Sequence, residues 1–435
     1  MTQWTNWAGT ATATPQRVHQ PRDTGEIAEA VASVALDGRR VRAWGSGHSF
    51  TAIAAADSDA IDLTGWTGIE AVDTTKHLVT VRSGTTLHNL NIELDKLGLG
   101  LTNMGDIDNQ TIAGALSTGT HGTGAKFGGM TTQIAALELV LADGSVVTCS
   151  ADERPELFAA ARLGLGALGV ISTVTLQCEP AYALSAQERP EPLETVLAGF
   201  ERDAATNDHF EFYWFPYGDN ALVKRNNRLP AGAPTKPLSR MKEYIDYELT
   251  ENIAFGALCR LGRAVPKLVR PLGKLSSNVL SGREYSDVSH KVFVTARSVR
   301  FVESEYAVPV ETLPDVLAGL RALVPKLENP VMFPVEIRVA QADDIWLSTA
   351  YGRDSAYIAI HQFVGMPYRE YFAGFESIVA EVGGRPHWGK MHTLGADDFR
   401  RLYPRFDDFL AVRKEVDPAG VFSNAYLDRV LGPAS

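Results

Sequence analysis

The stretch RAWGSGHSF, residues 42–50, places a histidine inside a glycine-rich loop that directly follows a short apolar strand. Loops of this kind usually bind a phosphate, because backbone without Cβ atoms can approach the group closely. The histidine, His48, is unusual in such a loop. Four interpretations stay open for it at this point: a catalytic base, a metal ligand, a buried structural residue or a point of cofactor attachment.

A second glycine-rich loop, STGTHGTG at residues 117–124, carries another histidine, His121. Lys126 is followed by Phe127 rather than by serine or threonine, so the loop is not the P-loop of an NTPase. One alternative for this loop is a tight structural turn beneath a sheet. Two such loops, neither with metal ligands nearby, favour a large cofactor that several backbone segments hold.

A third glycine-rich stretch, GLGALG at residues 164–169, has the spacing of a dinucleotide-binding fingerprint. That fingerprint needs a strand before the loop and a helix after it. Here the order is reversed, because PELFAAARL before the glycines is helical in pattern and VISTVTL after them is strand-like. We therefore reject a Rossmann fold.

The composition excludes several classes of protein. The 435 residues include 52 acidic and 41 basic side chains, a net charge of -11, without a basic cluster of the kind that follows a nucleic-acid backbone. Cys149, Cys178 and Cys259 form no CxxC pair, so neither a zinc site nor a disulfide framework is indicated. The first residues lack the pattern of a signal peptide, and no stretch approaches the roughly 20 apolar residues that cross a bilayer. We expect a cytoplasmic protein without a membrane span.

The order of helical and strand patterns predicts an α+β fold in three parts. Residues 1–180 alternate short helices and strands, with a hairpin at Asp143-Gly144. Residues 181–405 contain longer strands and predict a second sheet with helices on one face. Residues 406–435 predict a helix, a turn and a tail.

Two stretches of the second part carry more specific predictions. HKVFVTARSVRFVESEYAV, residues 290–308, has the pattern of one long strand. Residues 223–285 are rich in Lys, Arg and Pro and poorly periodic, so we expect a mobile segment there.

Four motifs together resemble a known family of flavoproteins. The chain is similar in these motifs, in order and over nearly its whole length, to the aldonolactone oxidoreductases and alditol oxidases of the vanillyl-alcohol-oxidase class. The sugar-lactone branch, with bacterial L-gulono-1,4-lactone oxidases and dehydrogenases, is the most similar. The motifs are GSGHS (45–49), MGDIDNQTIAGALSTGTHGTG (104–124), LGALGVIS (165–172) and HWGK (387–390).

The resemblance implies a two-subdomain, PCMH-type FAD-binding domain over residues 1–180 and an α+β cap domain with the substrate site over 181–405. The tail at 406–435 would return to the FAD domain. The residues that match the family's FAD contacts are Gly45, Ser46, Gly47, His48, Ser49, Met104, Gly105, Ala113, Gly114, Ser117, Gly119, Thr120, His121, Gly122, Gly169, Val170 and Ile171.

Two of these residues have specific roles in the family. His48 matches the histidine that many members bond covalently to the flavin 8α-methyl group, so the resemblance favours attachment. Gly105 matches a gatekeeper position over the flavin, where a larger side chain can block oxygen. A glycine there favours O2 as the electron acceptor.

Glu336 and Arg338 are two residues apart on one face of an otherwise apolar strand. From the spacing alone, a structural ion pair and a catalytic pair both stay open. The resemblance makes Glu336 the acceptor of the substrate hydroxyl proton and Arg338 its partner at the same oxygen. It also places Lys390 beside flavin N1, where its charge would stabilise the reduced ring.

The resemblance also brings Asp106 near the substrate. From its place on a late strand of the second sheet, we expect His361 to reach the same pocket. Alditol oxidases have a serine in place of Asp106, which argues against an acyclic polyol. His387 and His392 have no zinc-like partners nearby in the sequence, so we expect no metal site.

The resemblance therefore implies an FAD-dependent enzyme that oxidises a secondary alcohol of a sugar lactone by hydride transfer to flavin N5. The substrate would be of the L-gulono- or L-galactono-1,4-lactone type and the product ascorbate or an analogue. Reoxidation would use O2, giving H2O2, or another acceptor. Two alternatives stay open, an oxidase of a polyol or other sugar-like alcohol and a non-catalytic flavin- or sugar-binding protein.

Overall fold

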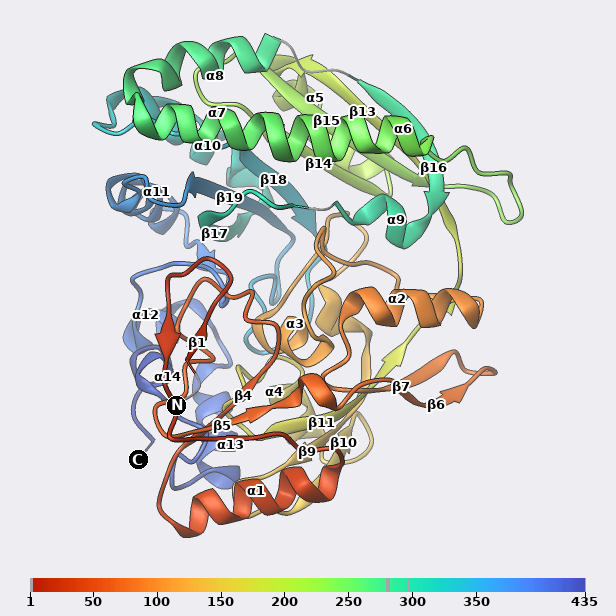
Figure 1. Cartoon of the computed structure of the whole chain (residues 1–435), viewed down its shortest axis with the longest axis vertical. Coiled ribbons are helices and arrows are strands. Elements are labelled where there is room, and N and C mark those ends of the chain that lie inside the picture. The colour runs from red at the N-terminus through yellow and green to blue at the C-terminus, as the bar shows by residue number, and fades with distance from the viewer. Residues whose placement is uncertain (1–2, 279–281, 296, 435) are drawn as a thin grey trace.

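The computed structural model describes residues 3–278, 282–295 and 297–434. The chain forms two halves that are stacked along the long axis of the molecule (Figure 1). One half contains small sheets built from the first 180 residues, and the other contains an eight-stranded sheet. Helices and sheets occur in both halves, which confirms the predicted α+β class.

A small parallel sheet positions the loop that contains His48. Its helix begins after Asp23, whose side chain accepts a hydrogen bond from the backbone N–H of Glu26. The strand before the loop ends at Trp44, so the loop leaves the carboxyl end of a parallel strand, where α/β sheets commonly bind ligands. The elements are β3 (Arg17–His19), α1 (Thr24–Leu36), β4 (Val41–Trp44) and β5 (Asp59–Asp62).

An antiparallel five-stranded sheet lies beside it, in the order β10-β9-β11-β7-β6. The hairpin predicted at Asp143-Gly144 joins two of its strands, with Gly144 at a φ of 82°. A helix precedes GLGALG and a strand follows it, the reverse of a Rossmann fingerprint, as predicted. The elements are β6 (Ile69–Asp73), β7 (Leu78–Arg82), α2 (Leu87–Lys96), α3 (Ile112–Thr118), β9 (Ile134–Val140), β10 (Val146–Ser150), α4 (Pro155–Ala161) and β11 (Val170–Gln177).

Short elements complete this half. They are β1 (Trp4–Thr5), β2 (Thr12–Ala13), η1 (Leu63–Gly65), β8 (Leu99–Gly100), η2 (Met130–Gln133) and β12 (Glu179–Pro180).

The second half is built on an antiparallel sheet in the order β16-β13-β15-β14-β18-β19-β17-β20. Side chains alternate across it, so that apolar residues face three helices and form one core. Its strands are β13 (Ala183–Pro192), β14 (His209–Trp214), β15 (Asn220–Arg228), β16 (Arg283–Val288), β17 (Phe301–Pro309), β18 (Val335–Ala340), β19 (Ser355–Phe363) and β20 (Arg385–Pro386). The helices of this core are α5 (Leu193–Thr206), α10 (Leu313–Leu323) and α11 (Arg369–Ala380), and η5 (Val310–Thr312) and η6 (Val324–Lys326) flank α10.

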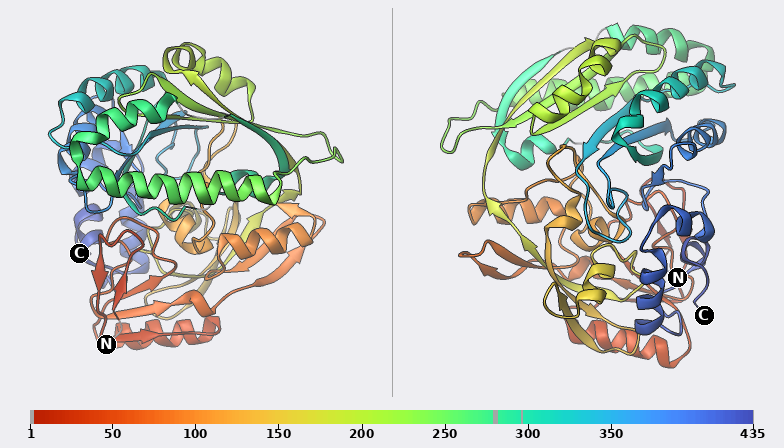
Figure 2. Two further views of the ribbon diagram at one scale, coloured as in Figure 1. Left: turned by 45° about the horizontal axis from the view of Figure 1, so that its top comes forward. Right: turned by 180° about the vertical axis from the view of Figure 1, so that it is seen from behind.

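The prediction that helices cover only one face of this sheet is wrong. A long helical segment crosses the opposite face, and Figures 1 and 2 show it on the other side of the sheet from α5. Cys259 of this segment packs against Phe301 and Phe363, whose strands face the cavity described below. The segment consists of α6 (Arg240–Glu243), the π-helical η3 (Tyr244–Ala254), α7 (Phe255–Ala264), η4 (Pro266–Leu268) and α8 (Val269–Asn278).

Of two further predictions for this half, that of one long strand over 290–308 is wrong. The stretch 223–285, which we expected to be mobile, contains most of β15 and this helical segment, and its residues 279–281 lie outside the described residues. Its periodicity is hard to recognise because many of its apolar side chains face outward instead of toward a core. The long strand expected over 290–308 divides into α9 (Ser289–Phe293) and β17, and residue 296 within it lies outside the described residues.

The last part of the chain packs on the first half. Phe399, Phe406 and Leu427 belong to one core with residues of α2, α3 and the five-stranded sheet. The same core includes Trp388 of the HWGK motif, whose indole N–H donates to the carbonyl of Leu347 at 2.8 Å. The elements are α12 (Ala396–Leu402), α13 (Phe406–Val416) and α14 (Ala425–Leu431).

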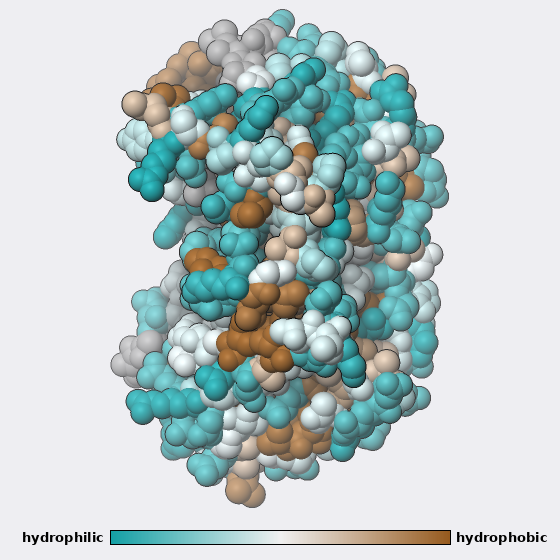
Figure 3. Space-filling model, turned by 90° about the vertical axis from the view of Figure 1, so that its right-hand side faces the viewer, coloured by the Kyte–Doolittle hydropathy of each residue, from teal (hydrophilic) through white to brown (hydrophobic). Residues whose placement is uncertain are grey.

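No helix among the described residues is long and apolar enough to cross a bilayer. A side view of the molecule shows a mostly hydrophilic surface on which apolar side chains gather in separate patches (Figure 3).

Candidate active site

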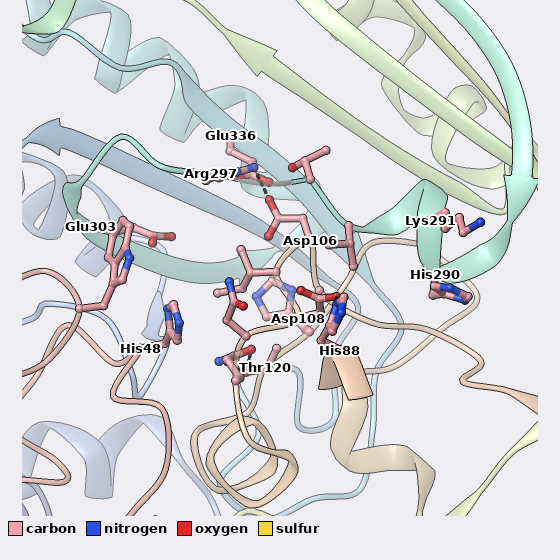
Figure 4. Close-up of a pocket in the computed structure, with 18 of the residues that line it drawn as sticks. His48, His88, Asp106, Asp108, Thr120, His290, Lys291, Arg297, Glu303 and Glu336 are labelled. Carbon is pink, nitrogen blue, oxygen red and sulfur yellow. Dashed lines mark hydrogen bonds and ion pairs between the residues drawn. The ribbon is translucent and has the colours of Figure 1, made fainter. Parts of the chain in front are cut away.

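A cavity of about 870 Å³ lies between the glycine loops of the first half and the eight-stranded sheet of the second. A smaller cavity of about 100 Å³ continues from it among the glycine-rich segments. His48, Ser49 and Thr118 line both cavities, so the two meet at the His48 loop. Figure 4 shows His48 across the larger cavity from Asp106 and Glu336.

The small cavity fits an extended anionic group such as the diphosphate of FAD. Within the described part of the chain, the backbone N–H groups of residues 46–49 donate to no protein acceptor, although all four residues line this cavity. Adjacent free N–H groups are a common binding site for anions. A Cβ atom on Gly45 would lie 2.2 Å from Thr111 Oγ1, and one on Gly169 would lie 2.8 Å from the carbonyl of Val140. Only glycine at these positions lets the lining segments come so close together.

A buried arginine fixes the arrangement of the small cavity. The guanidinium of Arg42 donates to the carbonyls of Leu165 at 2.9 Å and Gly166 at 2.7 Å, and also to those of Ile53 and Phe422. Burial lowers the pKa of Arg42 to about 10, and the charge of Arg413 acts in the same direction. Arg42 therefore ties β4 to the GLGALG loop and the C-terminal tail.

The structure brings most of the predicted cofactor residues to these two cavities. Those lining the small cavity are Gly45, Ser46, Gly47, His48, Ser49, Ala113, Gly114, Ser117, Gly169 and Ile171. Those lining the larger cavity are His48, Ser49, Gly105, Thr120 and His121. The four that line neither are Met104, Gly119, Gly122 and Val170. Met104 and Val170 belong to the hydrophobic cores behind the loops instead.

Glu336 and Arg338 of β18 form an ion pair on the wall of the larger cavity, and both are buried. Tyr213 of β14 donates a hydrogen bond of 2.9 Å to Glu336. Arg338 also donates through Nε to Glu211 at 2.9 Å and lies 3.1 Å from an oxygen of Asp106. One guanidinium is thus shared by three carboxylates.

Two more cations balance this group of carboxylates. Arg297, on the chain between α9 and β17, pairs with Asp106, as the dashed line in Figure 4 marks. Lys224 of β15 lies 3.4 Å from Glu211. The pair of Arg297 and Asp106 joins the second half of the molecule to the glycine-loop half directly above the cavity.

Glu336 differs from the other two carboxylates in the direction in which its pKa is shifted. Burial raises its pKa, and the charge of Arg338 opposes this only in part. Burial acts in the same direction on Asp106 and Glu211, yet the cations around them outweigh it and hold both pKa values below the ordinary ones. Glu336 is therefore the carboxyl group of the cluster that is most ready to take up a proton.

A second charged cluster surrounds Lys390. Its ammonium group pairs with Glu303 of β17 and lies 4.9 Å from the ring centre of Phe50, next to the His48 loop. The surrounding cations, Lys390 first, hold the pKa of Glu303 at about 2 despite its burial. His361 lies behind Glu303 at 3.5 Å and does not line the cavity. His361, which we expected at the substrate, is therefore separated from the cavity by Glu303.

His121, Glu305 and His387 form a buried group whose possible ligand atoms lie within 4.8 Å of one another. Both ring nitrogens of His121 face acceptors, the Glu305 carboxylate at 3.1 Å and the carbonyl of Gly122 at 2.9 Å. His387 Nδ1 accepts from the N–H of Gly389. These contacts hold the three side chains together in one hydrogen-bonded group at the wall of the cavity.

Sequence reasoning missed Arg297, Glu303, Glu305, Glu211 and Tyr213. A signal was present for the two glutamates of β17, because in FVESEYAVP they lie two positions apart on one face of a largely apolar strand, like Glu336 and Arg338. Nothing in the sequence around Arg297 distinguished it from a surface arginine.

Two family models together match most of the chain. The model of the D-arabinono-1,4-lactone oxidase family matches residues 174–430, and that of an FAD binding domain matches residues 15–150. L-gulono-1,4-lactone dehydrogenase of Mycobacterium tuberculosis is 43% identical, over 99% of each chain. L-gulonolactone oxidase of Mus musculus is 34% identical and alditol oxidase of a Streptomyces species is 31% identical, each over 98% of both chains.

Solved structures show the same fold. Cholesterol oxidase from B. sterolicum superposes with a TM-score of 0.82 at 19% identity, over 99% of this chain and 96% of that one. The predicted resemblance, fold class and FAD cofactor are thereby confirmed. With an FAD-binding domain before a D-arabinono-1,4-lactone oxidase region, the chain belongs to the aldonolactone oxidoreductase family and is an FAD-dependent oxidoreductase.

Proposed function

We propose that this enzyme oxidises the C2 hydroxyl of an aldono-1,4-lactone of the L-gulono or L-galactono type, giving ascorbate or an analogue. The observation that carries the proposal is the pair of Glu336 and Arg338, which faces the His48 loop across one cavity. FAD bound between the glycine loops supplies the acceptor for the hydride. The relatives named as gulonolactone dehydrogenase and oxidase favour a lactone over a polyol.

Glu336 takes the hydroxyl proton of the substrate. Its raised pKa brings it closer to neutral pH than an exposed glutamate, which is the property that a proton acceptor needs. Arg338 and Tyr213 hold the carboxylate in position, and Arg338 is available to bond the same substrate oxygen. Asp106 meets the substrate as part of an ion pair with Arg297 rather than as a free carboxylate.

Lys390 supplies a positive charge beside the bound flavin. Its position between Glu303 and Phe50 of the His48 loop supports this role, because it holds the ammonium group at the edge of the cavity. An ammonium group there stabilises the negative charge that the flavin ring gains on reduction.

His48 is the point of covalent attachment to FAD. Burial lowers its pKa, and Lys390 acts in the same direction, so the imidazole is neutral and has a free lone pair. Trp7 stacks on the ring, with 5.9 Å between centroids. Precipitation of the protein in acid tests the bond, because a covalent flavin stays yellow in the pellet and a free one stays in the supernatant.

O2 is the proposed electron acceptor, with H2O2 as product, because Gly105 has no side chain to cover the cavity at that point. A dye or a redox protein is the alternative, and the dehydrogenase name of one relative favours it. Oxygen consumption followed beside dye reduction in one substrate panel distinguishes the two. A cytoplasmic location is favoured by three cysteines that are all free and buried.

The experiment that tests the function is anaerobic bleaching of the flavin. L-gulono-1,4-lactone should bleach the yellow protein within seconds, and xylitol or sorbitol should do so much more slowly. Faster bleaching by the polyols would show that the substrate is a polyol and not a lactone. Failure of every lactone and polyol to bleach the protein would indicate a non-catalytic flavin- or sugar-binding protein.

A further inference from the structure

The helical segment at the outer edge of the second half exposes a series of apolar side chains to solvent. Their exposed fractions lie between 39% and 72%, which is unusual for so many large apolar residues on one element. They are Met241, Tyr244, Ile245, Leu249, Ile253, Leu261, Val265 and Leu268. Figure 1 shows this segment at the surface, at the opposite end of the molecule from α1.

Helix geometry places one row of apolar residues, from the end of η3 into α7, on the outer side. Ile253, Ala257 and Leu261 recur every four residues, so they share one side of the helix, and all three are exposed. Gly256 and Cys259 are buried on the side that faces the sheet. The helix therefore has apolar side chains toward solvent as well as toward the sheet, where Phe255 packs on Phe333.

The part of this segment after residue 251 is basic in an acidic protein, and the acidic residues of the segment all lie before it. Residues 252–282 contain five basic residues and no acidic residue, whereas the whole chain has a net charge of -11. The basic residues are Arg260, Arg263, Lys267, Arg270 and Lys274. We call residues 253–274 the basic apolar segment.

Four of these cations have no carboxylate partner in the described part of the chain, namely Arg260, Arg263, Lys267 and Arg270. Arg263 instead donates to the carbonyl of Val364, and Arg270 to the carbonyls of Pro325 and Leu327. Unpaired cations beside exposed apolar side chains match a surface that offers negative charge together with hydrocarbon.

We propose that the basic apolar segment docks the enzyme on the surface of an anionic lipid membrane. The apolar side chains enter the boundary between head groups and acyl chains, and the cations contact lipid phosphates. The cytoplasmic leaflet carries the negative surface potential that attracts such a segment. The helix lies flat on the membrane, as its length and its charge exclude a span.

A second copy of the chain fits this surface less well. A two-fold contact would place the same patch on both subunits and bring the unpaired cations of one segment against those of the other. Like charges at an interface disfavour association unless anions lie between them. A lipid surface supplies those anions in excess.

Docking through this segment also orients the enzyme. Tyr244 and Glu248 of η3, which directly precedes the segment, line the large cavity. The membrane-facing surface therefore continues directly into the wall of the cavity.

Sedimentation of the FAD-loaded enzyme with vesicles tests the proposal. Vesicles of phosphatidylglycerol and phosphatidylcholine should bind it at 50 mM salt, pure phosphatidylcholine should not, and 500 mM salt should weaken binding. L261S/V265S should lower the partition coefficient at least tenfold, and R260Q/K267Q about 10- to 30-fold. Leu36→Ser on α1, a residue that is 88% exposed, and R400Q/R401Q on α12 are controls that should bind like the wild type.

The proposal fails if wild-type enzyme does not sediment with anionic vesicles, or if the controls lose as much binding as the segment variants. It also fails if the wild type is a dimer that L261S/V265S converts to a monomer while neither binds vesicles. Retained flavin absorbance and an unchanged thermal midpoint show that the variants are folded. Vesicle binding does not depend on turnover, so this result and that of the bleaching experiment are separate.

Discussion

Replacing Glu336 with glutamine tests the proton acceptor without removing the side chain. The amide is nearly isosteric, can still accept the hydrogen bond from Tyr213, and leaves Arg338 its two other carboxylates. The fold should therefore persist, and the loss should fall on the chemical step. Loss of a positioned proton acceptor costs about 10²- to 10⁴-fold in rate, or about 2.7 to 5.4 kcal/mol in the activation free energy.

The assay is stopped-flow bleaching of the flavin under anaerobic conditions at saturating L-gulono-1,4-lactone. Glu211→Gln is the matched control, because Glu211 also pairs with Arg338 but does not line the cavity. We expect the control to slow reduction less than tenfold. Equal effects of the two substitutions, or a rate for E336Q within threefold of wild type, would refute the assignment of Glu336.

Three other predictions follow from the same site. The rate of flavin reduction should fall as pH is lowered through the pKa of Glu336, with an inflection above the ordinary glutamate value of 4.5 because burial raises that pKa; E336Q should lack the inflection in a pH series of single turnovers. Gly105→Ala would place a Cβ atom 3.3 Å from the carbonyl of His121, so reoxidation by O2, followed after mixing the reduced enzyme with oxygen, should slow far more than reduction by lactone, and equal slowing would contradict a gatekeeper role. His48→Ala should release its flavin into the acid supernatant, where absorbance at 450 nm measures it, whereas retention in the pellet would locate the attachment elsewhere.

The sequence predicted the glycine loops and the strand of Glu336 well, because both are local patterns. The loop after β4 and the alternation in β18 depend on neighbouring residues, and the structure has them where the pattern indicates. The partners of these residues depend on contacts between distant segments. Arg297 and Asp106 are 191 positions apart, and only the packing of the two halves brings them together.

Local patterns also mislead where a residue is surrounded by side chains from other strands or helices. His361 has the right alternation on β19 to face the cavity, but Glu303 on β17 lies between it and Lys390. Side chains on a neighbouring strand decide whether a residue reaches the cavity or is covered, and the residue's own strand does not reveal this.

The basic apolar segment shows the same limit for helices. Periodicity identifies which side of a helix is apolar, but it assumes that the apolar side faces the protein. In α7 the side that packs on the sheet carries the small residues Gly256, Cys259 and Gly262 together with Phe255, and Leu261 lies on the exposed side. Small residues let the helix lie close to its neighbours. A Cβ atom added to Gly262 would lie only 2.5 Å from the sulfur of Met332, so a larger residue would not fit there. Because this helix packs largely through glycine and cysteine, Leu261 and the neighbouring Ile253 and Val265 are free for contact with something outside the chain.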